Sequence, residues 1–118
     1  MNVLNLRQCR NILNADEHIE SVAFLNKKGK PVEITSKTSM FFQDLTEQQK
    51  EMLFMECILQ HSMNTEYDNE LGKTKYSIIE REDVLLFSFP IREFVVMVIS
   101  KLPMNPFVLK NKILQSCV

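Results

Sequence analysis

The segment from residue 46 to residue 63 has more apolar positions than a helix needs to pack on one side. At about 100° per residue, its apolar side chains fall on two different sides of a helix. A helix that is apolar nearly all round is buried, yet a chain of 118 residues has little protein with which to cover both sides. The pattern therefore predicts association with a second copy or another partner. One stripe comprises Met52, Met55, Leu59 and Met63, and the second comprises Leu53, Phe54, Cys57 and Ile58.

The two stripes differ in length, which suggests which stripe contacts the chain's own sheet and which contacts a partner. The methionine-rich stripe runs along the whole helix, so we assign it to the chain's own sheet. The second stripe occupies only the middle, which suits a crossing with the same helix of a partner. The reverse assignment stays open, because methionine is also favoured at adaptable interfaces. The predicted dimer surface on this helix comprises Leu53, Phe54, Cys57, Ile58 and His61.

Before this helix, the pattern predicts a short helix and a hairpin. Residues 3–14 place apolar side chains at helical spacing, and residues 19–26 and 31–35 are strand-like. Gly29 lies in the turn between these strands and can supply a positive φ if the turn type needs one. Residues 36–45 are expected to form a loop or a broken helical turn, followed by a capping box that begins the long helix.

After the long helix, the pattern predicts three strands and a last helix. Residues 74–81, 84–89 and 94–100 are strand-like, and the short links between them imply antiparallel neighbours. Asn105 caps a last helix that has Pro106 at its first position. This order of elements predicts a single α+β domain over the whole chain, in which helices pack on one five-stranded antiparallel sheet.

The overall composition is that of an ordinary globular domain. A net charge of −1 creates no strong field that would attract nucleic acid or an anionic membrane. Cys9, Cys57 and Cys117 lie far apart at no metal-ligand spacing, so we expect three free thiols, no metal and a reducing cytosol. The start of the chain lacks the apolar core of a signal peptide, and no apolar run reaches the roughly 18 residues of a membrane span. These observations predict a cytoplasmic protein.

Two short patterns suggest ligand sites but lack the remaining ligands. The tripeptide GKT at residues 72–74 would need another glycine five positions earlier, where Tyr67 stands, and a helix after it. Cys57 and His61 share a helix face and could hold a metal or form a thiol–imidazole pair. No other pair of ligands is evident to complete a metal site. We therefore expect no catalytic residues and no cofactor.

Three charged clusters are expected to be solvated surface. Residues 80–83 form a tight turn between strands, where carboxylates are exposed rather than held in a pocket with shifted pKa values. Residues 27–30 form a basic hairpin tip, which could touch an acidic partner or phosphates but has no interleaved aromatic residues. Residues 68–70 lack the alternating oxygen ligands of a calcium loop, so we interpret them as an exposed linker.

The order of elements resembles that of the roadblock (dynein light chain roadblock) domain over nearly the whole chain and is that of the profilin-like folds, which include longin and PAS-type domains. The segment YSIIEREDVLLFSFPI at residues 76–91, together with the FMECILQHSM helix before it, is similar to small stand-alone archaeal proteins of uncharacterised function with this same layout. The resemblance implies dimers that pair the central helix and extend the sheet across two chains. It also implies a platform for small GTPases or motor subunits, without a signature catalytic motif.

The leading hypothesis is a non-enzymatic dimerisation or scaffold module of regulatory type, which would be a partner of a small GTPase or a signalling complex. The alternative is a PAS-like sensor with a small molecule between sheet and helix. Large residues at inward positions weigh against the sensor, because a cavity of about 300 Å³ would be hard to leave open among them. These residues are Phe24, Phe54, Phe87, Phe89, Phe94 and Met97.

Overall fold

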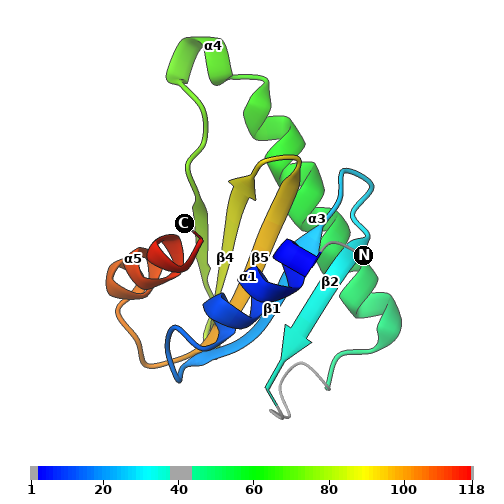
Figure 1. Cartoon of the computed structure of the whole chain (residues 1–118). Coiled ribbons are helices and arrows are strands. Elements are labelled where there is room, and N and C mark those ends of the chain that lie inside the picture. The colour runs from blue at the N-terminus through cyan, green and yellow to red at the C-terminus, as the bar shows by residue number, and fades with distance from the viewer. Residues whose placement is uncertain (1–2, 38–43, 118) are drawn as a thin grey trace.

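The computed structural model describes residues 3–37 and 44–117, and these form one five-stranded antiparallel sheet with helices on both faces (Figure 1). The predicted α+β fold class is confirmed. The strand order is β2-β1-β5-β4-β3. The strands are β1 (Ile19–Leu25), β2 (Pro31–Ser36), β3 (Ser77–Glu80), β4 (Val84–Ile91) and β5 (Phe94–Lys101). The helices are α1 (Val3–Leu13), α3 (Glu47–Thr65), α4 (Asp68–Leu71) and α5 (Pro106–Ser116).

The N-terminal hairpin lies beside the last three strands, as the order of elements predicts. Strand β1 pairs with β2 on one side and with β5 on the other, both antiparallel. Strand β4 joins β5 to β3, again with antiparallel neighbours. Gly29, in the β1–β2 turn, has a φ of +79°, so this turn does use the positive value that glycine can supply. Strands β2 and β3 are therefore the two edges of the described sheet.

Two hydrophobic clusters occupy the two faces of the sheet. The larger one joins α1 and α5 to the face that Figure 1 shows in front. The smaller one joins α3 to the opposite face. The fully buried members of the larger cluster include Ile12, Phe24, Phe87, Phe89, Leu109 and Ile113. Because β5 lies at the centre of the sheet, most of its side chains are buried on both faces.

Element boundaries differ from the sequence expectations in three places. Strand β3 is four residues long, because only residues 77–80 pair with β4. Strand β4 continues through Pro90, which pairs with Val95 beside the β4–β5 turn. The predicted linker at residues 68–70 belongs to the one-turn helix α4. Most of the predicted loop at residues 36–45 lies outside the described residues.

The start of α3 follows from local side-chain chemistry. The backbone N–H of Gln49 donates to Thr46 Oγ1 at 3.0 Å, and the backbone N–H of Thr46 donates to Gln49 Oε1 at 2.9 Å. This is the predicted capping box, which satisfies two backbone N–H groups that have no partner within the helix. None of the described helices has the length and apolar character that a membrane span requires.

Candidate interface on helix α3 and the edge strand β3

The side of helix α3 that was predicted to meet a partner faces the chain's own sheet. Phe54 and Ile58 are buried in the cluster beneath the helix, and Leu53 and Cys57 are half-buried beside them. The preferred assignment of the two stripes is therefore wrong: the stripe with Phe54 and Ile58 packs on the chain's own sheet, and the methionine-rich stripe is exposed. Four of the five residues predicted for the dimer surface pack against the chain's own sheet.

Side chains from three strands pack against this side of the helix. Ala23 and Leu25 on β1, Val84 on β4, and Val95, Met97 and Ile99 on β5 belong to the same buried cluster as Phe54 and Ile58. Burial of Phe54 and Ile58 contributes about 1.5–3 kcal/mol each to folding, as an upper estimate. The length of a stripe in the sequence carries no information about these contacts.

The opposite side of α3 carries an apolar stripe that is largely exposed to solvent. We call it the outer stripe, and it consists of Met52, Met55, Leu59 and Met63, whose exposed fractions are 56%, 42%, 53% and 65%. Single exposed apolar residues are normal on a protein surface. A row of four along one helix is unusual, and exposed apolar patches of this kind mark interaction sites. Methionine suits such a surface, because its flexible side chain adapts to different partners.

A groove runs between α3 and the β3 edge of the sheet, and we call it the flank groove. Its upper and lower parts have volumes of about 310 Å³ and about 670 Å³. Leu53 and Leu86 line both parts from the helix and from β4. Ile79 lines both parts from β3 and is 52% exposed. The flank groove is thus open, its lining combines these apolar side chains with polar and charged ones from α3 and residues 80–83, and it adjoins an edge strand of the described sheet.

Cys57 and His61, the pair considered as possible ligands, line different grooves. Cys57 lines the flank groove, whereas His61 lines a groove with Ile58 and the turns that connect the strands. Burial raises the pKa of the Cys57 thiol to about 11, and a hydrogen bond with Ser88 offsets only part of this increase. Among the residues that the structure describes, no group of three His, Cys, Asp or Glu side chains could hold a metal ion.

The space between α3 and the sheet is filled by side chains rather than by a closed cavity. Phe54 and Ile58 enter it from the helix, and Met97 and Ile99 meet them from β5. Of the large residues predicted to fill the inward positions, only Phe94 is not buried. The grooves beside α3 are open to solvent, so the described structure does not offer the enclosed pocket that the sensor hypothesis requires.

The other sequence patterns lie at the surface. Residues 72–76 are irregular chain between α4 and β3, so the GKT tripeptide does not connect a strand to a helix. The charged residues 80–83 are exposed at and after the end of β3. Lys27, Lys28 and Lys30 are exposed on the β1–β2 turn. These positions agree with the expectation of solvated charge.

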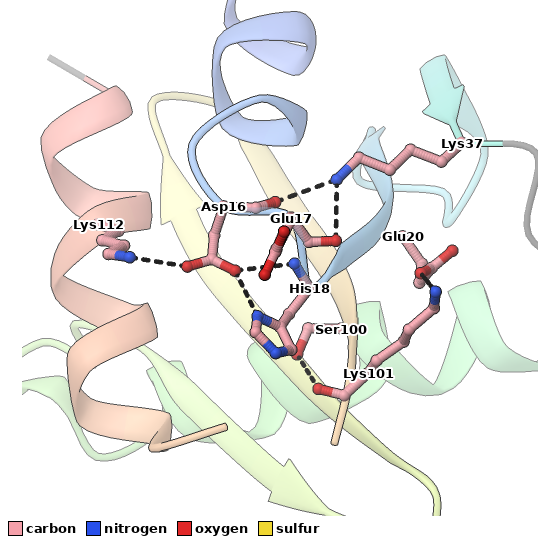
Figure 2. A network of polar contacts seen from close by, with 8 residues as sticks. All are labelled: Asp16, Glu17, His18, Glu20, Lys37, Ser100, Lys101 and Lys112. Carbon is pink, nitrogen blue, oxygen red and sulfur yellow. Dashed lines mark hydrogen bonds and ion pairs between the residues drawn. The ribbon is translucent and has the colours of Figure 1, made fainter. Parts of the chain in front are cut away.

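A charged network that sequence reasoning missed joins the α1–β1 turn to α5 (Figure 2). The Asp16 carboxylate accepts a hydrogen bond from the backbone N–H of His18 at 2.8 Å and lies 2.7 Å from His18 Nδ1. Its other oxygen forms an ion pair with Lys112 Nζ at 2.7 Å. The hydrogen bond from Lys112 and those from His18 outweigh burial and hold the pKa of Asp16 well below its ordinary value.

Two further lysines meet the same end of the molecule. Lys37 Nζ donates to the backbone carbonyls of Asp16 and Glu17, at 3.1 and 3.2 Å. Lys101 Nζ lies 2.9 Å from the buried carboxylate of Glu20. Lys37, which follows β2, and Lys112 on α5 thus bind the α1–β1 turn, whereas Lys101 joins β5 to β1. The sequence gives no signal for them, because Lys112 lies 96 residues from Asp16.

Comparison with solved structures identifies the fold. The Roadblock/LC7 domain from Streptomyces avermitilis superimposes with a TM-score of 0.70 at 12% identity, over 93% of this chain and 88% of that one. Myxococcus xanthus MglB gives 0.73 at 12% identity, over 99% and 92%. The gliding protein MglB of Thermus thermophilus gives 0.75 at 6% identity, over 99% and 87%. The chain therefore has a roadblock-like fold, as its sequence resemblance implied.

Sequence comparison places the chain in a family without assigning an activity to it. No curated protein matches the sequence. A family model does match, and it extends from residue 2 to residue 117, which is nearly the whole chain. The protein belongs to the family that this model describes, DUF6659, a family of unknown function.

Proposed function

We propose that the protein is a non-enzymatic regulatory scaffold that forms a homodimer and presents helix α3 to a partner protein. The observation that carries this proposal is the apolar surface that α3 leaves uncovered on two sides. The flank groove lies on one side and the outer stripe lies on the other. A chain of this size cannot cover both from its own described residues, and exposed apolar patches are typical of interfaces.

The flank groove is the surface proposed for the second copy. Strand β3 is an edge with unpaired backbone groups, so it can pair with the same strand of another chain. That pairing would bring Ile79 of each copy, together with Leu53 and Leu86, to a shared two-fold axis. A two-fold contact of this kind is self-complementary and closes after two copies. One of the similar solved structures is described as MglB with a tetrameric arrangement, which supports association in this fold.

The outer stripe is the surface proposed for the regulatory partner. It points away from the sheet, so a second copy joined at β3 would leave it accessible. Two copies would then present two such stripes on one side of the assembly. The roadblock resemblance favours a small GTPase or a component of a signalling complex as the protein that binds there.

Light scattering of three variants tests the arrangement. We expect a wild-type dimer, a folded monomer for Ile79→Asp, and a dimer for Leu59→Glu, because the last change lies on the outer stripe. Phe107→Asp is the matched control, since Phe107 is 63% exposed on α5, on the other face of the sheet. Circular dichroism establishes that each variant is folded.

Three results would count against the proposal. A wild-type monomer at high concentration would overturn the dimer. A monomeric Leu59→Glu protein beside a dimeric Ile79→Asp protein would place the second copy on the outer stripe. Capture of the same partner by wild type and by Leu59→Glu would remove the role proposed for the outer stripe.

A further inference from the structure

Strand β2, the edge opposite β3, also has an open apolar surface. Val32 and Ile34 are 42% and 40% exposed. Ile34 pairs with Ala23, and cross-strand partners share a face, so Ile34 lies on the α3 side of the sheet. Ser36 lies on the same face, where its hydroxyl is 2.9 Å from that of Ser21. Natural edge strands are usually protected by charged side chains, and Ile34 and Ser36, which are neighbours on this face of β2, are both uncharged.

The backbone of β2 is arranged to accept another strand. The N–H of Lys37 donates to the carbonyl of Glu20 at 2.8 Å. Together with the β1–β2 register, this bond identifies which residues of β2 direct their backbone groups toward β1. In an antiparallel pair, successive residues direct their backbone groups alternately toward and away from the neighbouring strand. Thr35 therefore faces β1, and Ile34 and Ser36 direct N–H and C=O outward. Within the described residues, β2 has a strand neighbour on one side only.

A groove of about 560 Å³ lies beside this edge, between β2 and α3. Ile34, Phe54 and Met55 form its apolar part. Its charged lining is predominantly basic, with four lysines against two glutamates: Lys28, Lys30, Lys37, Lys50, Glu47 and Glu51.

Two of these lysines, Lys28 and Lys30, are held at the mouth of the groove by the turn that carries them. Both are exposed, and their backbone N–H groups donate to Asn26 Oδ1 at 2.9 and 3.0 Å. The other two lysines have partners of their own, because Lys50 is 3.3 Å from Glu47 and Lys37 is bound to backbone carbonyls. The fixed turn therefore presents positive charge next to an apolar groove and an open strand edge.

From this combination we infer that β2 binds an extended, acidic segment of a partner protein as an additional strand. The segment hydrogen-bonds to the outward backbone groups of Ile34 and Ser36. Alternate side chains of the segment enter the groove beside Ile34 and Met55, and its carboxylates meet Lys28 and Lys30. In strand addition the backbone bonds supply affinity, and the pockets for alternate side chains supply specificity.

A second copy is a poorer occupant than an acidic segment. Antiparallel pairing of two β2 strands would bring the lysine-rich turn of each copy toward Lys37 of the other. Like charges placed opposite each other across a sheet are destabilising. Binding at β2 also leaves β3 free, so the inference goes beyond the proposed homodimer and can fail or hold independently of it.

Fluorescence anisotropy with a defined probe tests the inference. The probe is a labelled peptide of about six residues, a length typical of strands, with valines at its centre and glutamates at both ends, so that either direction of pairing places carboxylates beside the lysine-rich turn. Its control is the same peptide with lysine in place of glutamate. We expect the acidic peptide to bind and the basic peptide not to bind. We also expect binding to weaken as salt is raised, because exposed charge pairs are screened.

Protein variants separate the backbone contribution from the charge contribution. Ile34→Pro removes an outward N–H without removing a β1–β2 bond, so it should abolish binding, whereas Ile34→Thr keeps the N–H and should only weaken it. Replacing Lys28 and Lys30 together by Glu should weaken binding about tenfold or more. Lys73→Glu makes the same kind of charge change at an exposed position far from β2 and should leave binding unchanged.

The inference is overturned if folded Ile34→Pro binds the acidic peptide as wild type does, or if the basic peptide binds equally well. Absence of binding to wild type at millimolar peptide would also overturn it. Light scattering on the same variants tests whether a second copy of this chain, rather than an acidic segment, occupies β2. A fall in the mass of the assembly on Ile34→Pro would assign β2 to a second copy of this chain, while an unchanged mass leaves the β3 dimer and the β2 site as separate surfaces.

Discussion

Gly29 lies directly against Met55, so the tip of the β1–β2 hairpin is packed on helix α3. A Cβ built on Gly29 would stand 3.1 Å from Met55 Cε and 3.4 Å from Met55 Cα. Gly29 also has a φ of +79°, which side chains with a Cβ rarely adopt. The turn thus needs glycine for two reasons, and the contact fixes the position of the lysines at the mouth of the β2 groove.

Two glycine variants measure how much the positive φ and the contact with Met55 each contribute to the free energy of unfolding. Gly72 has a φ of +81° but no atom within 4 Å of the position of a Cβ. Gly72 also has a ψ of 166°, a combination that is essentially restricted to glycine, so we expect Gly72→Ala to lose about 1–3 kcal/mol of unfolding free energy through backbone strain alone. Gly29→Ala should lose free energy through strain and up to about 1 kcal/mol more because Met55 must also move. Urea unfolding measures both losses, and a Met55→Ala background should reduce the loss at Gly29 while leaving the loss at Gly72 unchanged. The same loss at Gly29 in both backgrounds would show that the Met55 contact carries no energy.

Local signals in the sequence were sufficient for most of the fold. The alternation of residues 31–35, the glycine in the turn, and the capping box at Thr46 and Gln49 each depend on neighbours within a few residues. The antiparallel order of β3, β4 and β5 follows from short links, which leave little choice of partner. The full extent of the sheet then follows from the need to cover both apolar faces of β5.

The orientation of α3 and the charged network around Asp16 could not be predicted from local signals in the sequence. Both stripes of α3 are apolar, and the stripe with Phe54 and Ile58 packs against side chains that come from different strands, such as Ala23 on β1 and Val95 on β5. Asp16 and Lys112 are joined only after the sheet brings α5 beside the α1–β1 turn. Side-chain periodicity describes one element at a time, so it cannot report contacts that the packing of several elements creates.

A pair of adjacent substitutions tests the orientation of α3. Ile58 is 8% exposed and Leu59 is 53% exposed, although they are neighbours in the same helix. We expect Ile58→Glu to unfold the domain or to cost more than about 3 kcal/mol, because the charge would be buried without a partner. Leu59→Glu should change the unfolding free energy by less than about 0.5 kcal/mol. Circular dichroism during urea unfolding gives both values, and a stable, folded Ile58→Glu protein would contradict the observed orientation.

The Asp16–Lys112 ion pair makes the stability depend on pH. The folded state lowers the pKa of Asp16, so the pair stabilises the protein above the pKa of the unfolded chain, about 3.9. This stabilisation is lost as the pH falls through the folded-state pKa. Asp16→Asn should therefore cost about 1–2 kcal/mol at pH 7 and progressively less below about pH 4.

Urea unfolding at pH 7 and at pH 3 measures the change. Asp83→Asn, at an exposed position on the β3–β4 turn, is the control and should have little effect at either pH. If Asp16→Asn lost the same free energy at both pH values, the carboxylate charge would not be the source of the stabilisation.

The three cysteines should behave as unreactive free thiols. Burial, with a smaller contribution from Glu33, raises the pKa of Cys9 to about 12. Burial also raises the pKa values of Cys57 and Cys117 to about 11. The thiolate is the reactive form, and an ordinary cysteine has a pKa near 8.5. Alkylation of the folded protein by iodoacetamide at pH 8 should therefore be slow at all three positions.

The order of labelling is the sharper part of this prediction. Cys9 is fully buried in the larger hydrophobic cluster, between α1, α5 and the sheet, and should react last, whereas Cys57 and Cys117 are only partly buried. Raising the pH toward 10 should speed labelling at Cys57 and Cys117, because more thiolate forms as the pH approaches their pKa values. Denaturant should make all three react quickly. Mass spectrometry of the labelled peptides follows each position. Labelling of Cys9 as fast as Cys57 in folded protein would contradict its burial, and an intact mass lower by two hydrogen atoms, or a stoichiometric bound zinc, would refute the free thiols.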